Sequence, residues 1–281
     1  MAYLHRLLVA LCLGLLLGNA HAQSNLSNLS NLRKLAMNTP LPLFYRELVA
    51  FDIDAHGALA FPDPAPDYHF AARTSVVPLL LHEVPLALRH YPLVFLPGDT
   101  KNPPTLAALV GIGDERNRFV ETDGRWRRDT YVPAWVRRYP FIAVNAEWQT
   151  DPVLALDPQA EWIKQGGGER LIKDGKPTPR LEFIIAFQKE FQDFALRTQA
   201  VAKALQDAGV LEDGSLRIES PANDKTEQAR EIKGFLTVSE QKLRALSAEA
   251  VARLHQADAL GLAYAQLFSL ANLPNVLTGT P

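Results

Sequence analysis

TPRLEFIIAFQKEFQDFALRTQAVAKALQDAG, residues 178–209, has the periodicity and the ends of a long helix. Mostly apolar side chains recur at intervals of three or four residues, which places them on one face of an α-helix. Thr178 and Pro179 suit the N-cap and the first helical position, and Gly209 suits the C-terminal end. The stretch therefore predicts an amphipathic helix that ends near Asp207. Its inward face is Leu181, Ile184, Ile185, Phe191, Phe194, Ala195, Thr198, Val201, Ala202 and Leu205.

After this helix the sequence returns to strand-like segments and then to helical spacing. Residues 216–218 and Ile232–Val238 are apolar or β-branched at alternate positions, which predicts two strands. Ser247 suits an N-cap, and apolar residues then recur at helical spacing as far as Asn272. We therefore expect a second long helix from Ser247 to Asn272.

Before residue 178 the apolar segments are short and are bounded by proline or glycine. Leu93–Leu96, residues 104–112 and Phe141–Val144 predict buried strands. A short helix is expected from Pro133 to Arg138. The predicted fold class is α+β, with short strands and turns in the N-terminal half and two long amphipathic helices in the C-terminal half.

The N-terminus has the three parts of a secretory signal peptide. His5-Arg6 is a short polar beginning, residues 7–17 are an apolar run, and Ala20-His21-Ala22 forms an A-x-A cleavage site. The apolar run is shorter than the roughly 20 residues that a membrane span needs. We expect cleavage after Ala22 and no transmembrane span in the mature chain.

The expected organisation has three parts. Residues 1–22 form the signal peptide, residues 23–39 a low-complexity spacer with a Ser-Asn-Leu repeat, and residues 40–275 a single domain. The signal peptide predicts a periplasmic or cell-surface protein. Translation from Met37 would instead give a cytoplasmic protein, so both locations stay open.

Composition and motifs exclude several classes of protein. The net charge of −2 over 281 residues gives no basic footprint for nucleic acid. Cys12, the single cysteine, lies in the apolar run, so the mature chain would have no thiol chemistry. We find no nucleophile elbow, no phosphate-binding loop and no metal-ligand spacing. The sequence predicts no catalytic residue, no cofactor and no metal site, and it favours a non-enzymatic protein.

One stretch has an unusual composition: GRWRRDTYVPAWVRRYPF, residues 124–141, holds five arginines, two tryptophans and two tyrosines. Arginine can bind a carboxylate or phosphate through two parallel hydrogen bonds, and aromatic rings can stack on a ligand. This composition gives a set of candidate ligand-binding residues. They are Arg125, Trp126, Tyr131, Trp135, Arg137, Arg138 and Tyr139.

Two other interpretations of the stretch remain open. The aromatic side chains could pack in the core while the arginines stack on them and pair with nearby acids, which would make the stretch a structural brace. All four tryptophans of the chain lie between residues 126 and 162, which also suits a carbohydrate-binding surface.

Several blocks of the sequence resemble the bacterial SapC family. The resemblance covers roughly residues 40–275, and the Tyr131–Ala134 and Arg137–Phe141 blocks are its most specific parts. Further similar blocks are residues 107–111, 117–120, 123–126, 171–181 and 246–270. The family is associated with surface-layer proteins of Gram-negative bacteria, and it has no established reaction from which catalytic residues could be carried over.

The resemblance implies a non-enzymatic cell-envelope protein in surface-layer biogenesis or ligand binding. Its expected partners are surface-layer or outer-membrane proteins. The alternative is an enzyme or accessory factor that acts on a peptide or carboxylate-bearing substrate, with residues 124–141 as its pocket.

Overall fold

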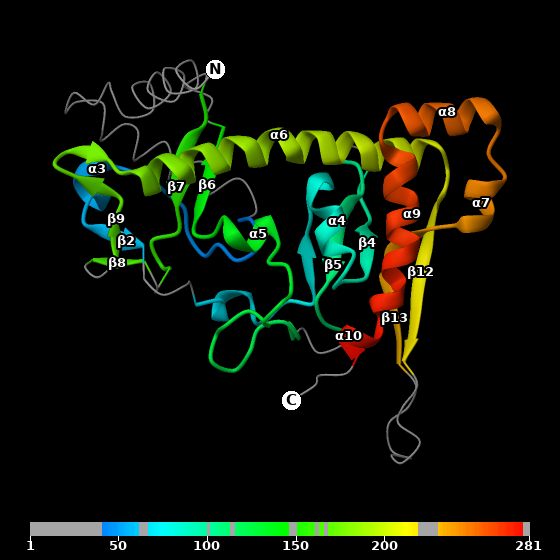
Figure 1. Ribbon diagram of the computed structural model, residues 1–281, viewed down its shortest axis with the longest axis horizontal. Coiled ribbons are helices and arrows are strands. Elements are labelled where there is room, and N and C mark those ends of the chain that lie inside the picture. Colours follow the sequence, from blue (N-terminus) through cyan, green and yellow to red (C-terminus); the bar gives the residue numbers. More distant parts are fainter. Residues whose placement is uncertain are drawn as a thin grey trace, which may run out of the picture. The chain divides into compact units, whose positions relative to one another are not determined.

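The computed structural model describes residues 41–61, 67–99, 102–112, 116–145, 151–160, 163–165, 168–218 and 230–277 (Figure 1). The predicted signal peptide and spacer lie outside these ranges. Contacts group the chain into two units that interleave along the sequence. The first unit draws on Met1–Asp67 and Arg138–Gln192, and the second draws on Tyr68–Arg137 and Asp193–Pro281. The extent of the domain, residues 40–275, stays a prediction.

Both strands and helices are present in the described residues, so the predicted α+β class is confirmed. The first unit contains two small antiparallel sheets, of strand order β1-β7-β6 and β8-β2-β9, and the hairpin β10-β11. Its elements are β1 (Val49–Ala50), α3 (Ile53–His56), β2 (Leu59–Phe61), β6 (Phe141–Val144), β7 (Val153–Leu156), β8 (Lys164–Gln165), β9 (Glu169–Arg170), β10 (Ile172–Lys173) and β11 (Lys176–Pro177).

The long helix α6 (Pro179–Asp207) begins and ends where its sequence predicts. The Thr178 carbonyl accepts the first helical hydrogen bond from the Glu182 amide at 3.0 Å. The Thr178 hydroxyl does not cap the helix but donates to the Arg170 carbonyl at 2.7 Å. After the helix, Gly209 has a φ of 68°, a left-handed conformation that glycine adopts easily.

The start of α6 closes the core of the first unit. Leu181 and Ile184 from its inward face are buried in one cluster with side chains from β6, β7 and the segment around β10. This agrees with the predicted periodicity at the start of the helix, because Leu181 and Ile184 are three residues apart and enter the same apolar cluster. The cluster consists of Phe51, Phe141, Leu154, Leu156, Ile163, Leu171, Ile172, Leu181 and Ile184.

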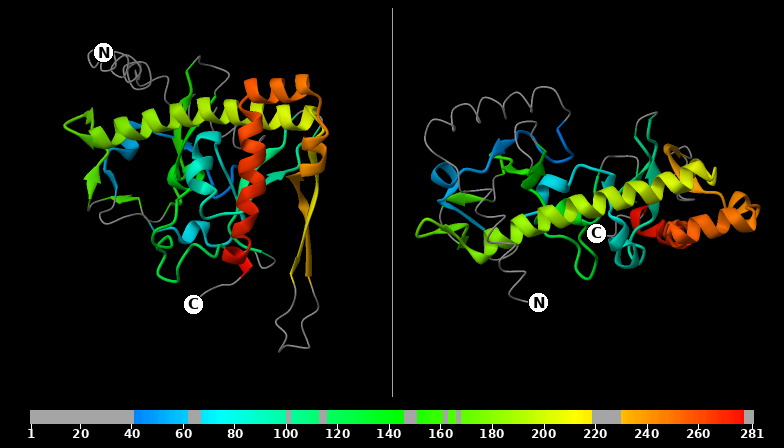
Figure 2. Two further views of the ribbon diagram at one scale, coloured as in Figure 1. Left: turned by 45° about the vertical axis from the view of Figure 1, so that its right-hand side comes forward. Right: turned by 90° about the horizontal axis from the view of Figure 1, so that it is seen from above.

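The second unit is built on a five-stranded antiparallel sheet of order β12-β13-β4-β5-β3. Its strands are β3 (Val76–Pro78), β4 (Leu93–Leu96), β5 (Thr105–Leu109), β12 (Leu211–Ile218) and β13 (Arg230–Val238). Strand β4 has the predicted bounds, whereas β12 begins five residues before the predicted strand at residues 216–218. Strands β12 and β13 run side by side as a two-stranded ribbon (Figure 2).

The second predicted long helix is wrong, because the chain forms α8 (Ala248–Gln256) and α9 (Ala259–Ser269) with a break between them (Figure 1). Ser247 caps α8 as expected, since its hydroxyl accepts a hydrogen bond from the Ala250 amide at 3.2 Å. The break falls at Asp258, whose φ is 59°. A short polar side chain tolerates this left-handed conformation, and the Asp258 carboxylate pairs with Arg197 of α6 at 2.5 Å.

Helix α9 is attached to the sheet by buried polar side chains as well as by apolar packing. Gln266 donates to the Leu93 carbonyl and accepts from the Val238 amide, each at 3.0 Å, which ties α9 to β4 and β13. Ser269 accepts from the Leu93 amide at 2.8 Å. These bonds fix the rotation of α9, and therefore they decide which of its faces points away from the sheet.

The remaining elements of the second unit are short. They are η1 (His69–Ala71), η2 (Leu81–Glu83), α4 (Val84–Ala87), α5 (Ala134–Arg137), α7 (Glu240–Arg244), η3 (Leu270–Asn272) and α10 (Pro274–Leu277). Helix α5 lies where Pro133 predicted a helix. Among the described residues, no helix combines the length and the apolar character that a membrane span requires.

Candidate functional site

The stretch of residues 124–141 begins as a tight turn in the second unit. Gly124 has a φ of 80°, and Trp126 forms an isolated antiparallel bridge with Val120. Helix α5 and the Tyr139–Pro140 cis peptide bond follow before β6. The division between the two units falls between Arg137 and Arg138, so the candidate residues belong to both units.

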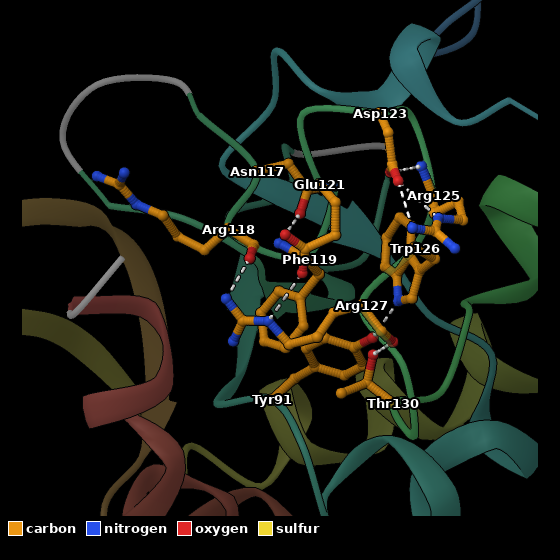
Figure 3. Close-up of polar contacts among 10 residues, drawn as sticks. All are labelled: Tyr91, Asn117, Arg118, Phe119, Glu121, Asp123, Arg125, Trp126, Arg127 and Thr130. Carbon is orange, nitrogen blue, oxygen red and sulfur yellow. Dashed lines mark hydrogen bonds and ion pairs between the residues drawn. The ribbon is translucent and has the colours of Figure 1, made fainter. Parts of the chain in front are cut away.

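Trp126 lies inside a cluster of aromatic rings (Figure 3). Only 8% of the residue is exposed, and its indole packs edge-on against Tyr68 with 5.6 Å between ring centroids. Its indole N–H donates to the Tyr91 hydroxyl at 3.1 Å. The Tyr91 hydroxyl in turn donates to the Tyr131 carbonyl, and burial raises the pKa of Tyr91. Trp126 therefore links the turn to the chain ahead of α5.

Arg125 lies at the surface and pairs with Asp123, two residues earlier (Figure 3). The guanidinium Nε donates to an Asp123 carboxylate oxygen at 2.7 Å, and the Arg125 backbone N–H donates to the other oxygen at 3.0 Å. Both side chains are largely exposed. The hydrogen bonds from Arg125 lower the pKa of the Asp123 carboxyl. This is a local ion pair at a turn on the surface.

Arg127, which was not a candidate, shows how an arginine of this stretch packs on an aromatic ring. Its guanidinium carbon lies 4.9 Å from the centroid of the Phe119 ring, and Nη2 donates to the Arg118 carbonyl at 2.6 Å (Figure 3). Glu121 lies 3.8 Å from its Nε. A cation stacked on an aromatic face in this way stabilises the fold while its charge stays compensated.

Tyr131 and Arg137 belong to a polar network around a buried carboxylate, Glu83. Only 1% of Glu83 is exposed, and its Oε1 accepts from the Tyr131 hydroxyl at 2.7 Å and from the Ala134 amide at 2.6 Å. Its Oε2 accepts from the Leu80 amide at 2.8 Å. Arg137 donates to the Tyr131 hydroxyl at 3.0 Å. Burial, followed by the charge of Glu83, raises the pKa of Tyr131.

Glu83 therefore holds the first turn of α5 against the end of η2. Its carboxylate receives the backbone N–H of Ala134 in α5 and that of Leu80, the residue just before η2, and it orients the tyrosine on which Arg137 rests. Arg137 itself is exposed, and its Nε also donates to the Val132 carbonyl at 3.0 Å. Trp135 lies on the same short helix and is partly exposed.

Arg138 and Tyr139 are buried in the first unit. The Arg138 guanidinium carbon lies 4.3 Å from the Phe191 ring centroid and 5.8 Å from the Tyr45 ring centroid. Burial lowers the pKa of Arg138, and this effect is opposed by Tyr45. The Tyr139 hydroxyl donates to Asp157, which is fully buried, at 3.4 Å.

The seven candidates thus fall into separate local environments. Arg125 is in a surface ion pair, Trp126 is in an aromatic cluster, and Tyr131 and Arg137 share the network of Glu83. Arg138 and Tyr139 lie in the core of the first unit, and Trp135 is partly exposed on α5. Their assignment to a ligand stays a prediction. The other two tryptophans of the carbohydrate interpretation, Trp148 and Trp162, lie outside the described residues.

Sequence reasoning missed two central residues, Glu83 and Tyr91. Both precede the stretch by more than thirty positions, and neither belongs to a recognisable motif. The available signal was a single acid in a mainly apolar segment, since Glu83 follows Leu80, Leu81 and His82 and precedes Val84 and Pro85. A lone acid in such a context is usually buried only when it is paired or hydrogen-bonded.

The fold and this network define an α+β protein whose arginine- and aromatic-rich stretch is extensively hydrogen-bonded to its own chain. In the described part of the chain, His, Cys, Asp and Glu do not gather in a group of three or more that could hold a metal ion. The chain matches the SapC family over residues 52–276, and it belongs to that family. No curated protein and no solved structure matches the chain.

Proposed function

We propose that this chain is a non-enzymatic protein of the cell envelope that serves surface-layer biogenesis. The observation that carries the proposal is membership of the SapC family over residues 52–276, together with that family's association with surface-layer proteins. The signal-like sequence of residues 1–22 supports the location. Surface-layer or outer-membrane proteins are the expected partners.

In this proposal the stretch of residues 124–141 is a structural brace. Two kinds of contact support this role: Trp126 is buried among rings, and Tyr131 and Arg137 lean on the buried Glu83. A catalytic site would instead be expected to hold reactive groups in a cleft with room for a substrate.

A second candidate function, binding of a carboxylate-bearing peptide, is favoured by one observation. Arg137 is exposed on α5, and its guanidinium donates to the Tyr131 hydroxyl, which orients it. A carboxylate of such a peptide could bind this exposed guanidinium. The two functions differ in what the loss of Arg137 does, since the brace requires Glu83 and Trp126 more than it requires Arg137.

The proposed function predicts a defect in the surface layer when the gene is deleted in a bacterium that makes this protein and a surface layer. Surface-layer protein would be measured by extraction from intact cells and by electron microscopy. We expect deletion to reduce the layer, and the full chain to restore it.

A matched complementation uses a chain that lacks residues 1–22. It shows whether restoration of the surface layer requires export of the protein as well as its folded domain. We expect this shortened chain to accumulate without restoring the layer, because it would not leave the cytoplasm. An unaltered surface layer after deletion, or equal restoration by the two chains, would contradict the proposal.

A further inference from the structure

Helix α9 has a second apolar face, on the side that does not pack on the sheet. One face carries Gln266 and Ser269, which bond to β4 and β13. The other carries Gly261, Tyr264, Ala265 and Phe268, at intervals of three and four residues. Phe268 is 69% exposed and Tyr264 is 41% exposed. A helix that is apolar on all sides is normally buried on all sides, so this face is suited to a partner.

A pocket of about 380 Å³ opens beside the N-terminal half of this face. It is enclosed by α4, by the second half of α6 and by α9, all within the second unit. Its walls are apolar apart from His82 and the Arg197–Asp258 ion pair, whose atoms are 2.5 Å apart. A Cβ atom added to Gly261 would meet no atom within 4 Å, so the helix surface at this residue is open. The apolar walls are mainly Leu81, Val84, Pro85, Leu88, Phe194 and Leu262.

The exposed ring of Phe268 and the open site at Gly261 lie on the same side of α9, about two turns apart. Phe268 follows Gly261 by seven residues, which is about two turns or roughly 10 Å along α9. After seven residues a helix returns to within about 20° of the same direction. The projecting Phe268 ring and the recess at Gly261 thus lie on the same side of α9, along a line parallel to the helix axis. The midpoint between them falls between Tyr264 and Ala265.

We propose that this face binds a second copy of the chain, with the two α9 helices antiparallel about a two-fold axis between Tyr264 and Ala265. A rotation about that axis exchanges positions 261 and 268, so each Phe268 enters the pocket beside Gly261 of the partner copy. Such an interface is isologous, because each copy contributes both the ring and the recess.

Charge favours a second copy over a charged partner. The sequence from Ala259 to Leu277 contains no Asp, Glu, Lys, Arg or His, so two such helices meet without like-charge repulsion. The charged groups at the rim of the pocket, Arg197 and Asp258, already pair with each other within one copy. Small residues at 261 and 265 also allow the two helices to approach closely, and Phe268 supplies an aromatic anchor of the kind that dominates interface energies.

Sedimentation of the purified full chain over a range of micromolar concentrations tests the proposal. We expect a monomer–dimer equilibrium whose dissociation constant rises on the order of tenfold or more in Phe268→Ala, which removes the ring, and in Gly261→Trp, which fills the recess. Phe183→Ala is the matched control. Phe183 is 60% exposed and stacks on Phe187, its neighbour four residues on, as Phe268 stacks on Tyr264, but it lies on α6 in the first unit.

Mixing the two variants distinguishes this interface from general apolar adhesion. Gly261→Trp keeps the ring and lacks the recess, whereas Phe268→Ala keeps the recess and lacks the ring. A mixture can form one complete ring–recess contact, so it should dimerise more tightly than either variant alone. Circular dichroism would establish that both variants are folded.

A full chain that stays monomeric at all concentrations would overturn the proposal. Binding of vesicles or of another protein by this face of a monomeric chain would overturn it too. Dimerisation of both variants at the affinity of the unmodified chain would overturn it as well. A mixture that is no tighter than the separate variants would also overturn it.

Discussion

Replacing Glu83 with alanine is expected to lower the free energy of unfolding by about 3–5 kcal/mol. The substitution leaves the Leu80 and Ala134 amides without their carboxylate acceptor in a buried setting. An unsatisfied buried donor costs roughly 1–3 kcal/mol, and the Tyr131 hydroxyl loses its acceptor as well. Urea unfolding followed by circular dichroism would measure the change.

Two further variants show whether the loss comes from these hydrogen bonds. Glu83→Gln keeps one acceptor oxygen but places an NH₂ group near an N–H donor, so we expect a smaller loss of about 1–3 kcal/mol. Glu240→Ala removes an exposed carboxylate that pairs with Arg244 on the surface, and it should change stability by less than about 1 kcal/mol. Equal stabilities for Glu83→Ala and Glu240→Ala would contradict the role assigned to Glu83.

Replacing Trp126 with alanine is expected to cost about 3–5 kcal/mol of unfolding free energy. The indole fills space between Tyr68 and Phe119, and its N–H donates to the Tyr91 hydroxyl at 3.1 Å. Trp126→Phe should cost less, because a ring remains while the hydrogen bond is lost. Thermal and urea unfolding would give both values.

Arg125→Ala is the matched control for Trp126→Ala, because the two residues are adjacent and differ in burial. The Arg125 ion pair is exposed to solvent, so its loss should change stability by less than about 1 kcal/mol. A brace at residues 124–141 predicts a large difference between the two variants. If Trp126→Ala folded with the stability of the unmodified chain and lost only ligand binding, Trp126 would belong to a binding site instead.

Local sequence signals were sufficient for elements whose ends are set by nearby residues. Helix α6 has a proline at its first position and a glycine after its end, and both ends are where those residues predict. Strands β4 and β6 are short apolar runs next to proline, and their bounds also agree with the prediction. In each case the chemistry that ends the element lies within a few residues of it.

Contacts between residues that are far apart in the sequence could not be predicted from such local signals. Glu83 and Tyr131 are 48 positions apart, and only the packing of α5 near η2 brings them together. At the break, Asp258 pairs with Arg197 of another helix, 61 positions earlier in the sequence. The pocket beside α9 needs three helices to form, so no single stretch of sequence indicates it.

Composition singled out the candidate stretch, but composition does not distinguish a ligand site from a brace. Arginine and aromatic side chains have the same chemistry in both. Their surroundings make the difference: Trp126 meets rings, Arg125 meets the acid two residues before it, and Arg138 lies against Phe191. These partners come mostly from segments far away in the sequence.

Action at the cell envelope is tested most directly by N-terminal sequencing of the protein from fractionated cells. The proposed location predicts a chain that begins at Gln23 and is recovered from the periplasmic or surface fraction, because cleavage would follow Ala22. A chain found only in the cytosol, uncleaved at Met1 or beginning at Met37, would contradict it.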